Sequence, residues 1–89
     1  MTREIHIASC VVQARPESLD AVAAQIRAVK LAEIAASDPR GRLVILLERS
    51  SAAEVLDAID AIRDLPGVIG VNLVYQHAED EHALQELIA

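Results

Sequence analysis

Aromatic residues are nearly absent from this 89-residue chain, which has one tyrosine, Tyr75, and neither phenylalanine nor tryptophan. Hydrophobic residues nevertheless make up 53% of the chain. A hydrophobic core must therefore be built from Ile, Leu, Val and Ala side chains. A chain of this length is expected to form one domain.

Cysteine is also scarce, because Cys10 is the single one in the sequence. One cysteine excludes an internal disulfide and any multi-cysteine metal site. Cys10 lies inside an apolar run, so we expect a small core residue rather than a nucleophile. His6, His77 and His82 have no cysteine or second histidine at ligand spacing. We therefore expect neither a metal nor another cofactor.

Basic residues are in the minority, with 8 Lys and Arg against 14 Asp and Glu and a formal charge of −6. This balance disfavours nucleic acid and anionic membranes as partners, while a basic peptide is electrostatically allowed. No run approaches the roughly 20 apolar residues that span a bilayer. Met1 to Glu4 carry no signal-peptide pattern, so we expect a cytoplasmic protein.

The most informative stretch is Ile5–Gln13, whose residues are apolar or small in both alternating registers. A strand with one solvated face alternates with period two, so this run is expected to be covered on both faces. Arg42–Glu48 shows the same character and predicts a second central strand. Ala32–Ser37 is a weaker strand candidate, and Val68–Tyr75 is predicted to be the last strand.

Two amphipathic helices are predicted between these strands. Arg15-Pro16-Glu17 favours a helix start, and apolar residues then recur at helical spacing from Leu19 to Val29. Ser51-Ala52-Ala53-Glu54 matches a capping box, and Pro66-Gly67 predicts the end of the second helix. Asp38-Pro39-Arg40-Gly41 suits a type I turn between two strands.

The resulting order, βαββαβ, predicts an α+β fold of the ferredoxin-like type. This fold is a four-stranded antiparallel sheet with two helices on one face, and its other face is left open. We assign residues 1–78 to this domain. Residues 79–89 are expected to form an acidic C-terminal tail, either a short helix or disordered.

The side chains on the open face follow from strand parity. If residues 38–41 form the turn, Ser37 lies opposite Arg42 and Glu33 opposite Leu46. Burying Glu48 without a partner is costly, so its register should point outward. The residues expected on the open face are Ser9, Val11, Gln13, Glu33, Ala35, Ser37, Val44, Leu46, Glu48, Gly70, Asn72, Val74 and Gln76. The opposite register is expected to face the helices, and it contains Ala8, Cys10, Val12, Ile34, Ala36, Leu43, Ile45, Leu47, Ile69, Val71, Leu73 and Tyr75.

A mostly aliphatic face with Glu33 and Glu48 toward one end complements an apolar peptide with a basic end. Two alternatives stay open from the residues alone: the tail or a second copy of the chain covers the sheet, or the domain dimerises and senses a small molecule. No paired-cysteine loop supports metal trafficking. The sequence shows neither a nucleophile–base pair nor a glycine-rich phosphate loop, so an enzyme is not expected.

Several segments, in this order and spacing, resemble the NapD family. They are Ala8–Glu17, Ser37-Asp38 before Gly41–Val44, Ile62–Val68 and Leu73–His77. Two positions depart from the family pattern. Cys10 replaces a leucine in the first strand, and Lys30-Leu31 replaces the Pro-Gly that commonly follows the first helix.

The resemblance implies a cytoplasmic assembly chaperone for the catalytic subunit of periplasmic nitrate reductase. It implies binding of that subunit's twin-arginine signal peptide as a helix on the open sheet face, holding back export until the molybdenum cofactor is inserted. The positions that it implicates are Ser9, Val11, Val44, Leu46, Asn72 and Val74. Glu33 and Glu48 are added as arginine partners on charge and parity, and Gln13 is added because it shares the outward register of Ser9 and Val11. The chain itself is expected to be a monomer or weak homodimer.

Overall fold

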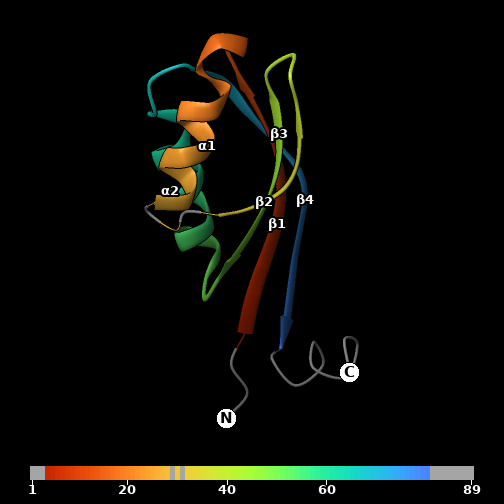
Figure 1. Cartoon of the computed structure of the whole chain (residues 1–89). Helices are drawn as coiled ribbons and strands as arrows, with labels where there is room; N and C mark the ends of the chain where they lie inside the picture. Colours follow the sequence, from red (N-terminus) through yellow and green to blue (C-terminus); the bar gives the residue numbers. More distant parts are fainter. Residues whose placement is uncertain (1–3, 29, 31, 81–89) are drawn as a thin grey trace.

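The computed structural model describes residues 4–28, 30 and 32–80. The elements follow the predicted order: β1 (Glu4–Ala14), the short 3₁₀ helix η1 (Pro16–Ser18), α1 (Leu19–Ala28), β2 (Glu33–Asp38), β3 (Arg42–Arg49), α2 (Ala52–Arg63) and β4 (Val68–Asp80). The strands form one antiparallel sheet in the order β2-β3-β1-β4. Both helices lie on one face of the sheet (Figure 1). The predicted ferredoxin-like fold is confirmed.

The core lies between the helices and the two central strands. Alternate residues of β1 and β3 point into it, as predicted for Ala8, Cys10, Val12, Leu43, Ile45 and Leu47, all of which are at most 1% exposed. The helices contribute Val22, Ala23 and Ile26 from α1, and Val55, Ala58, Ile59 and Ile62 from α2. The core is thus aliphatic, and no aromatic side chain enters it.

The helix starts agree with the sequence signals, with two refinements. Pro16 opens the 3₁₀ turn η1, and α1 follows it directly. At α2 the Ser51 hydroxyl accepts a hydrogen bond from the Glu54 N–H at 3.2 Å. The Glu54 carboxylate accepts from the N–H of Ser50 at 2.9 Å, one residue before the position that a capping box predicts.

The β2–β3 hairpin differs from its predicted register. Gly41 donates its N–H to the Asp38 carbonyl at 2.9 Å, and Gly41 adopts a φ of +110°. Asp38 therefore pairs with Arg42, and Ser37 pairs with Leu43 instead of Arg42. The three-residue connection, which suits a turn ending in a glycine with positive φ, explains the shift by one.

An irregularity at Ala35 compensates for this shift. The pairing passes from Ile34–Ile45 to Ala36–Val44, so Ala35 is an extra residue on β2. Glu33 consequently lies opposite Leu46, as predicted. Ala36 pairs with the outward-facing Val44, so its prediction as a helix-facing residue was wrong.

β4 is five residues longer than predicted and also contains a bulge. Cys10 pairs with Leu73 and Ser9 with Tyr75, so Val74 is the extra residue. Tyr75 therefore shares the outward register of Ser9, and Gln76 shares the helix-facing register of Ala8. Both of these sequence predictions were wrong, because a bulge exchanges the two faces of every later residue.

The ends of α1 and β4 also bear on predictions from the sequence. Ile69, predicted to face the helices, is 64% exposed beside a second irregularity in the β1–β4 ladder. Lys30 follows α1 with a φ of +53°, a left-handed conformation that glycine adopts more readily. Most of the predicted acidic tail, residues 81–89, lies outside the described part of the chain, while β4 includes residues 79 and 80.

Candidate functional site

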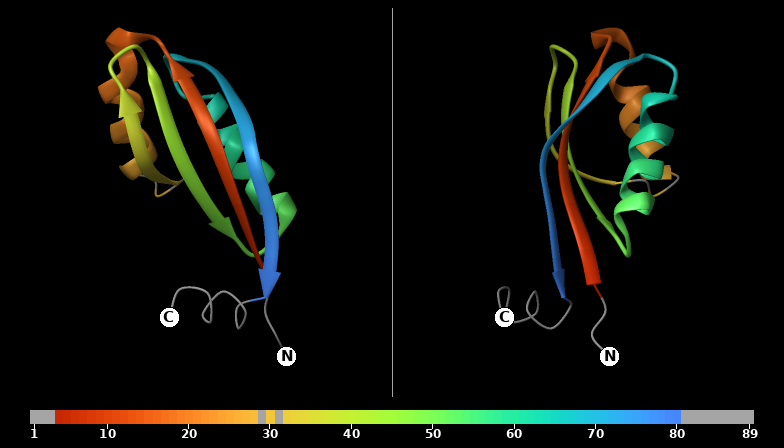
Figure 2. Two further views of the ribbon diagram at one scale, coloured as in Figure 1. Left: turned by 90° about the vertical axis from the view of Figure 1, so that its right-hand side faces the viewer. Right: turned by 180° about the vertical axis from the view of Figure 1, so that it is seen from behind.

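One side of the sheet carries no helix. The left view of Figure 2 looks onto this side, with β2, β3, β1 and β4 side by side and both helices behind them. We define the open face as the outward-facing residues of these strands. They are Ile7, Ser9, Val11, Gln13, Glu33, Ala36, Asp38, Arg42, Val44, Leu46, Glu48, Gly70, Asn72, Val74, Tyr75 and His77.

The centre of the open face is a shallow apolar hollow of about 590 Å³. Val11, Val44 and Val74 belong to its apolar lining, with Asn72 beside them on β4. Ala36, Ser37, Asp38, Arg42 and Gln13 complete the lining toward the β2–β3 hairpin. The hollow spans all four strands, so its shape depends on the whole sheet and on no single loop.

Of the nine residues predicted as binding positions, five line this hollow: Val11, Gln13, Val44, Asn72 and Val74. The other four lie on the same face by register. Ser9 and Glu33 are the partners of Leu46 on either side of β3, and Glu48 lies opposite Ile7. Leu46 is 40% exposed, which is unusual for a leucine on a central strand. The structure thus brings all nine onto one surface.

Charge divides the open face along the strands. Glu33 and Glu48 lie on the side of the hollow toward the C-terminal end of β3. Glu48 also borders a smaller hollow of about 200 Å³ with Ile5, Arg49 and Ser50. A cation approaching this end of the open face would meet the carboxylates of Glu33 and Glu48.

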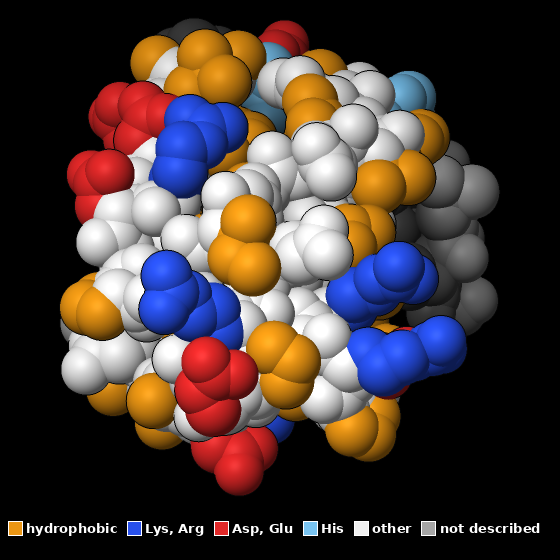
Figure 3. All heavy atoms as spheres, turned by 90° about the horizontal axis from the view of Figure 1, so that it is seen from above, with side chains coloured by type: hydrophobic (Ala, Val, Ile, Leu, Met, Phe, Trp, Pro, Cys, Tyr) orange, Lys and Arg blue, Asp and Glu red, His pale blue; other side chains and the backbone are white. Residues whose placement is uncertain are grey.

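The opposite end of the face, at the β2–β3 hairpin, carries arginines. The Arg40 guanidinium contacts the Asp38 carboxylate through Nη2 at 3.1 Å and through Nε at 3.3 Å. The Arg40 backbone N–H donates to the same carboxylate at 2.9 Å. These bonds, the backbone one first, hold the pKa of Asp38 below its ordinary value. Figure 3 looks down on this end and shows Lys and Arg side chains on several sides of it.

Ile7 shares the parity of Ser9 and was left out of the predicted face. Sequence reasoning also missed four outward residues at irregular positions: Ala36, Tyr75, Asp38 and His77. Each lies at or beyond a bulge or the hairpin connection, so strict alternation placed it wrongly or left it unassigned. Arg42 shares the parity of Val44 and was also left out, although it lines the hollow. The signal that was available is the hydroxyl of Tyr75, since a tyrosine hydroxyl suits an exposed register better than an aliphatic core.

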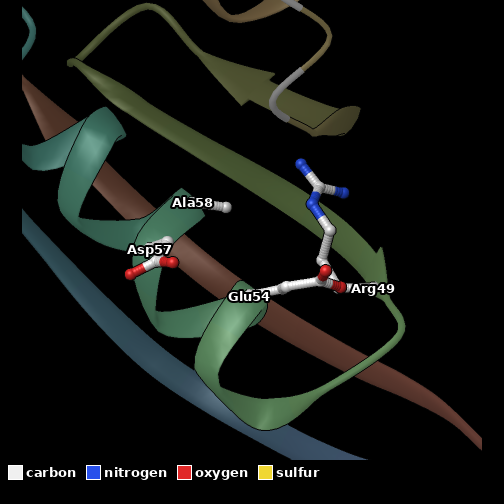
Figure 4. A pocket seen from close by; sticks show the side chains of 4 residues that line it. All are labelled: Arg49, Glu54, Asp57 and Ala58. Carbon is white, nitrogen blue, oxygen red and sulfur yellow. The ribbon is translucent and has the colours of Figure 1, made fainter.

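Another hollow, of about 390 Å³, lies on the helix side between the end of β3 and the start of α2. Its lining mixes Arg49, Glu54, Asp57 and Ala58. Figure 4 shows the Glu54 side chain reaching toward Arg49, and Asp57 pointing away from Arg49. Since Glu54 already caps α2, this hollow has a structural use and does not present a convergent set of polar groups.

The described residues contain no group of three or more His, Cys, Asp or Glu side chains arranged to hold a metal ion. Cys10 is buried in the core, and burial raises the pKa of its thiol, which disfavours the reactive thiolate. No helix within residues 4–28, 30 and 32–80 is long and apolar enough to cross a membrane.

Comparison with known proteins agrees with this architecture over nearly its whole length. The family model described as NapD protein matches residues 5–80. The chain belongs to the NapD family. It is 33% identical to the chaperone NapD of Escherichia coli K12 over 76 residues, which cover 84% of this chain and 87% of that protein. It is 31% identical to the NapD chaperone of Haemophilus influenzae over 80 residues, 89% of this chain and 85% of that protein.

A solved NapD structure confirms the fold independently. The solution structure of the E. coli Tat proofreading chaperone protein NapD superimposes with a TM-score of 0.74 at 33% identity, covering 86% of this chain and 81% of that one. NapD proteins are chaperones and not enzymes, and this chain is accordingly a member of a chaperone family.

Proposed function

We propose that this chaperone binds the twin-arginine signal peptide of the catalytic subunit of periplasmic nitrate reductase on its open face. Binding would take place in the cytoplasm and restrain export until the molybdenum cofactor has been inserted. The observation that carries the proposal is the uncovered apolar hollow with two carboxylates beside it. The name of the E. coli relative, a Tat proofreading chaperone, supports the same class of partner.

The dimensions of the face suit a helical peptide. Neighbouring strands lie about 4.8 Å apart, so β3, β1 and β4 together span roughly 10 Å between their outer axes. An α-helix with its side chains is about 10–12 Å in diameter. A helix laid along the strands would cover Val11, Val44 and Val74 with one apolar stripe, which is the helix-in-groove mode of recognition.

The charges favour one partner chemistry and one orientation. An arginine-bearing end would be attracted to Glu33 and Glu48 and repelled from Arg42 at the other end of the hollow. The net charge of −6 adds a long-range attraction for a cationic segment. The attraction between these exposed charges is screened by salt, whereas the apolar contact is not.

Titration calorimetry of the full chain with a synthetic signal peptide tests the proposal. We expect a 1:1 complex whose affinity falls as salt is added. A flat titration at tens of micromolar peptide would contradict the proposed function. Sedimentation of the free protein in the same buffer tests the accompanying expectation of a monomer or weak homodimer.

A charge reversal on the open face sharpens this test. Glu48→Lys should weaken binding of the intact peptide more than binding of a peptide whose two arginines are replaced by glutamine. Glu17→Lys is the matched control, because it makes the same change of charge on the exposed turn η1, away from the open face. Equal losses from the two variants would show a net-charge effect without a local site.

A further inference from the structure

The aromatic residue of the chain, Tyr75, stands on the open face. Its register partner on β1 is Ser9, which lies opposite Leu46 on β3. Tyr75 is 52% exposed although it could have joined the core without the bulge at Val74. A protein that builds its core without aromatic rings therefore presents one ring on its uncovered surface.

His77 extends this aromatic surface. The rings of Tyr75 and His77 are stacked, with centroids 5.9 Å apart and planes inclined by 25°. His77 lies opposite Ile7, and Ile7 lies opposite Glu48 on its other side. Two successive rows across the sheet consequently read Glu33–Leu46–Ser9–Tyr75 and Glu48–Ile7–His77.

These rows place carboxylates on one flank of the open face and aromatic rings on the other, with Leu46, Ser9 and Ile7 between them. Glu48 on β3 is two strand spacings from β4, roughly 10 Å at the backbone, whereas Glu33 on β2 is three spacings away, roughly 14 Å. Because the side chains rise from the sheet into this interval, one planar cation can contact a ring and a carboxylate together.

A guanidinium is the cation that fits such an arrangement. It is planar, stacks on aromatic faces and bonds carboxylates through a fixed fork of N–H donors, whereas the lysine ammonium is a compact, strongly hydrated charge. Charge attraction by Glu33 and Glu48 alone would not distinguish these two cations. The aromatic flank supplies a reason for preferring arginine.

We propose that Tyr75, supported by the stacked His77, is the residue that selects arginine in the bound peptide, its ring forming the surface on which a guanidinium stacks while Glu48 balances the charge. This inference rests on the proposed function and adds a selectivity residue to it. It also fixes the direction of the peptide: the arginines lie over the two rows that contain Tyr75 and Glu48, and the apolar segment continues over Val11 and Val44.

The test compares three peptides of one sequence, carrying two arginines, two lysines or two glutamines, by titration calorimetry. Tyr75→Leu should lower the affinity for the arginine peptide by about two- to fivefold, the range expected for an exposed cation–π contact. The affinity for the lysine peptide should fall less, and the affinity for the glutamine peptide should not change. Tyr75→Phe keeps the ring and should bind the arginine peptide as the unchanged protein does.

Leu73→Ala is the matched control on the same strand. Leu73 is also about half exposed, but its partner is the helix-facing Cys10, so all three peptides should bind this variant normally. Thermal melts followed by circular dichroism check that each variant is folded. An equal loss for all three peptides in Tyr75→Leu, or no loss for any, overturns the inference.

A direct measurement separates this inference from the proposed function. Tyr75 is the only tyrosine, so its ring protons are assigned without ambiguity in a nuclear Overhauser spectrum of the complex. We expect cross-peaks to the arginine Hδ protons of the peptide. A complex with cross-peaks from Tyr75 to apolar peptide residues alone would disprove the arginine role and leave the proposed function standing, whereas absence of any complex would disprove the proposed function itself.

Discussion

Ser9 on β1 lies directly opposite Tyr75 on β4, although Cys10 is paired with Leu73, so Val74 is the extra residue of a bulge. This one insertion changes the composition of the open face. Without it, Gln76 would occupy the outward register and the tyrosine ring would turn toward the helices. The bulge therefore exchanges an amide for an aromatic surface beside the apolar hollow.

Leu46 offers a clean test of whether the open face binds peptide. Leu46→Gln should weaken binding of the signal peptide by about 1 kcal/mol, roughly fivefold in affinity, because the apolar area of a leucine is lost from the contact. Leu56→Gln makes the same substitution on the solvent side of α2, at a leucine that is 54% exposed against 40% for Leu46. Calorimetry should show normal affinity for Leu56→Gln; similar losses in both variants would argue against the sheet face.

Gly41 is expected to be essential for the hairpin. Its φ of +110° is strained for other residues, and an added Cβ would lie 2.2 Å from the Ala14 carbonyl oxygen. Gly41→Ala should lower the free energy of unfolding in urea by on the order of 1–3 kcal/mol. Gly70→Ala is the control, because its Cβ would meet no atom within 4 Å, and it should change stability little.

Cys10 should be unreactive in the folded protein. The thiol is buried and its pKa is raised, so alkylation at pH 8 should be far slower than in urea. The raised pKa also predicts that stability is retained at neutral pH and falls as the pH rises through the unfolded thiol's value of about 8.5, since the unfolded state ionises first. Mass spectrometry of the alkylated protein measures the first effect. Rapid labelling without denaturant would contradict the buried position.

The lowered pKa of Asp38 predicts a pH dependence of stability with the opposite sign. Its lowered pKa means that the folded state favours the carboxylate, through the Arg40 backbone N–H first and the Arg40 side chain second. The stabilisation is therefore present above the ordinary value of about 3.9 and is lost as the pH falls through the lower folded value. A carbon-detected NMR titration should place Asp38 below its ordinary value. Asp38→Asn should remove this part of the acid dependence.

The sequence predicts the regular parts of this fold well because regularity is what alternation and helical spacing encode. Ala8, Cys10 and Val12 face the core as expected, and Ser51 caps α2. The bulges at Ala35 and Val74 leave no comparable trace, since each adds a residue without any glycine or proline to mark it. The open face was consequently predicted well near its centre and poorly beyond the bulges, where Ala36 and Tyr75 were assigned to the wrong side.

The polar end of β4 illustrates a second reason for error. Gln76 to Asp80 have little strand propensity, yet β4 continues through them because the first residues of β1 offer an unpaired edge. Backbone pairing between distant segments overrides local preference here. No window of the sequence shorter than the whole domain contains that information.

The pairing of β1 with β4 also has a consequence for when the chaperone becomes active. During synthesis β1 keeps an open edge until β4 has been made, and Asn72, Val74 and Tyr75 are part of β4. A chain synthesised only as far as α2 therefore lacks the edge strand β4 and the side of the hollow that β4 supplies. Under the proposed function, binding of the signal peptide therefore requires β4, and a chain translated only as far as α2 should not bind it.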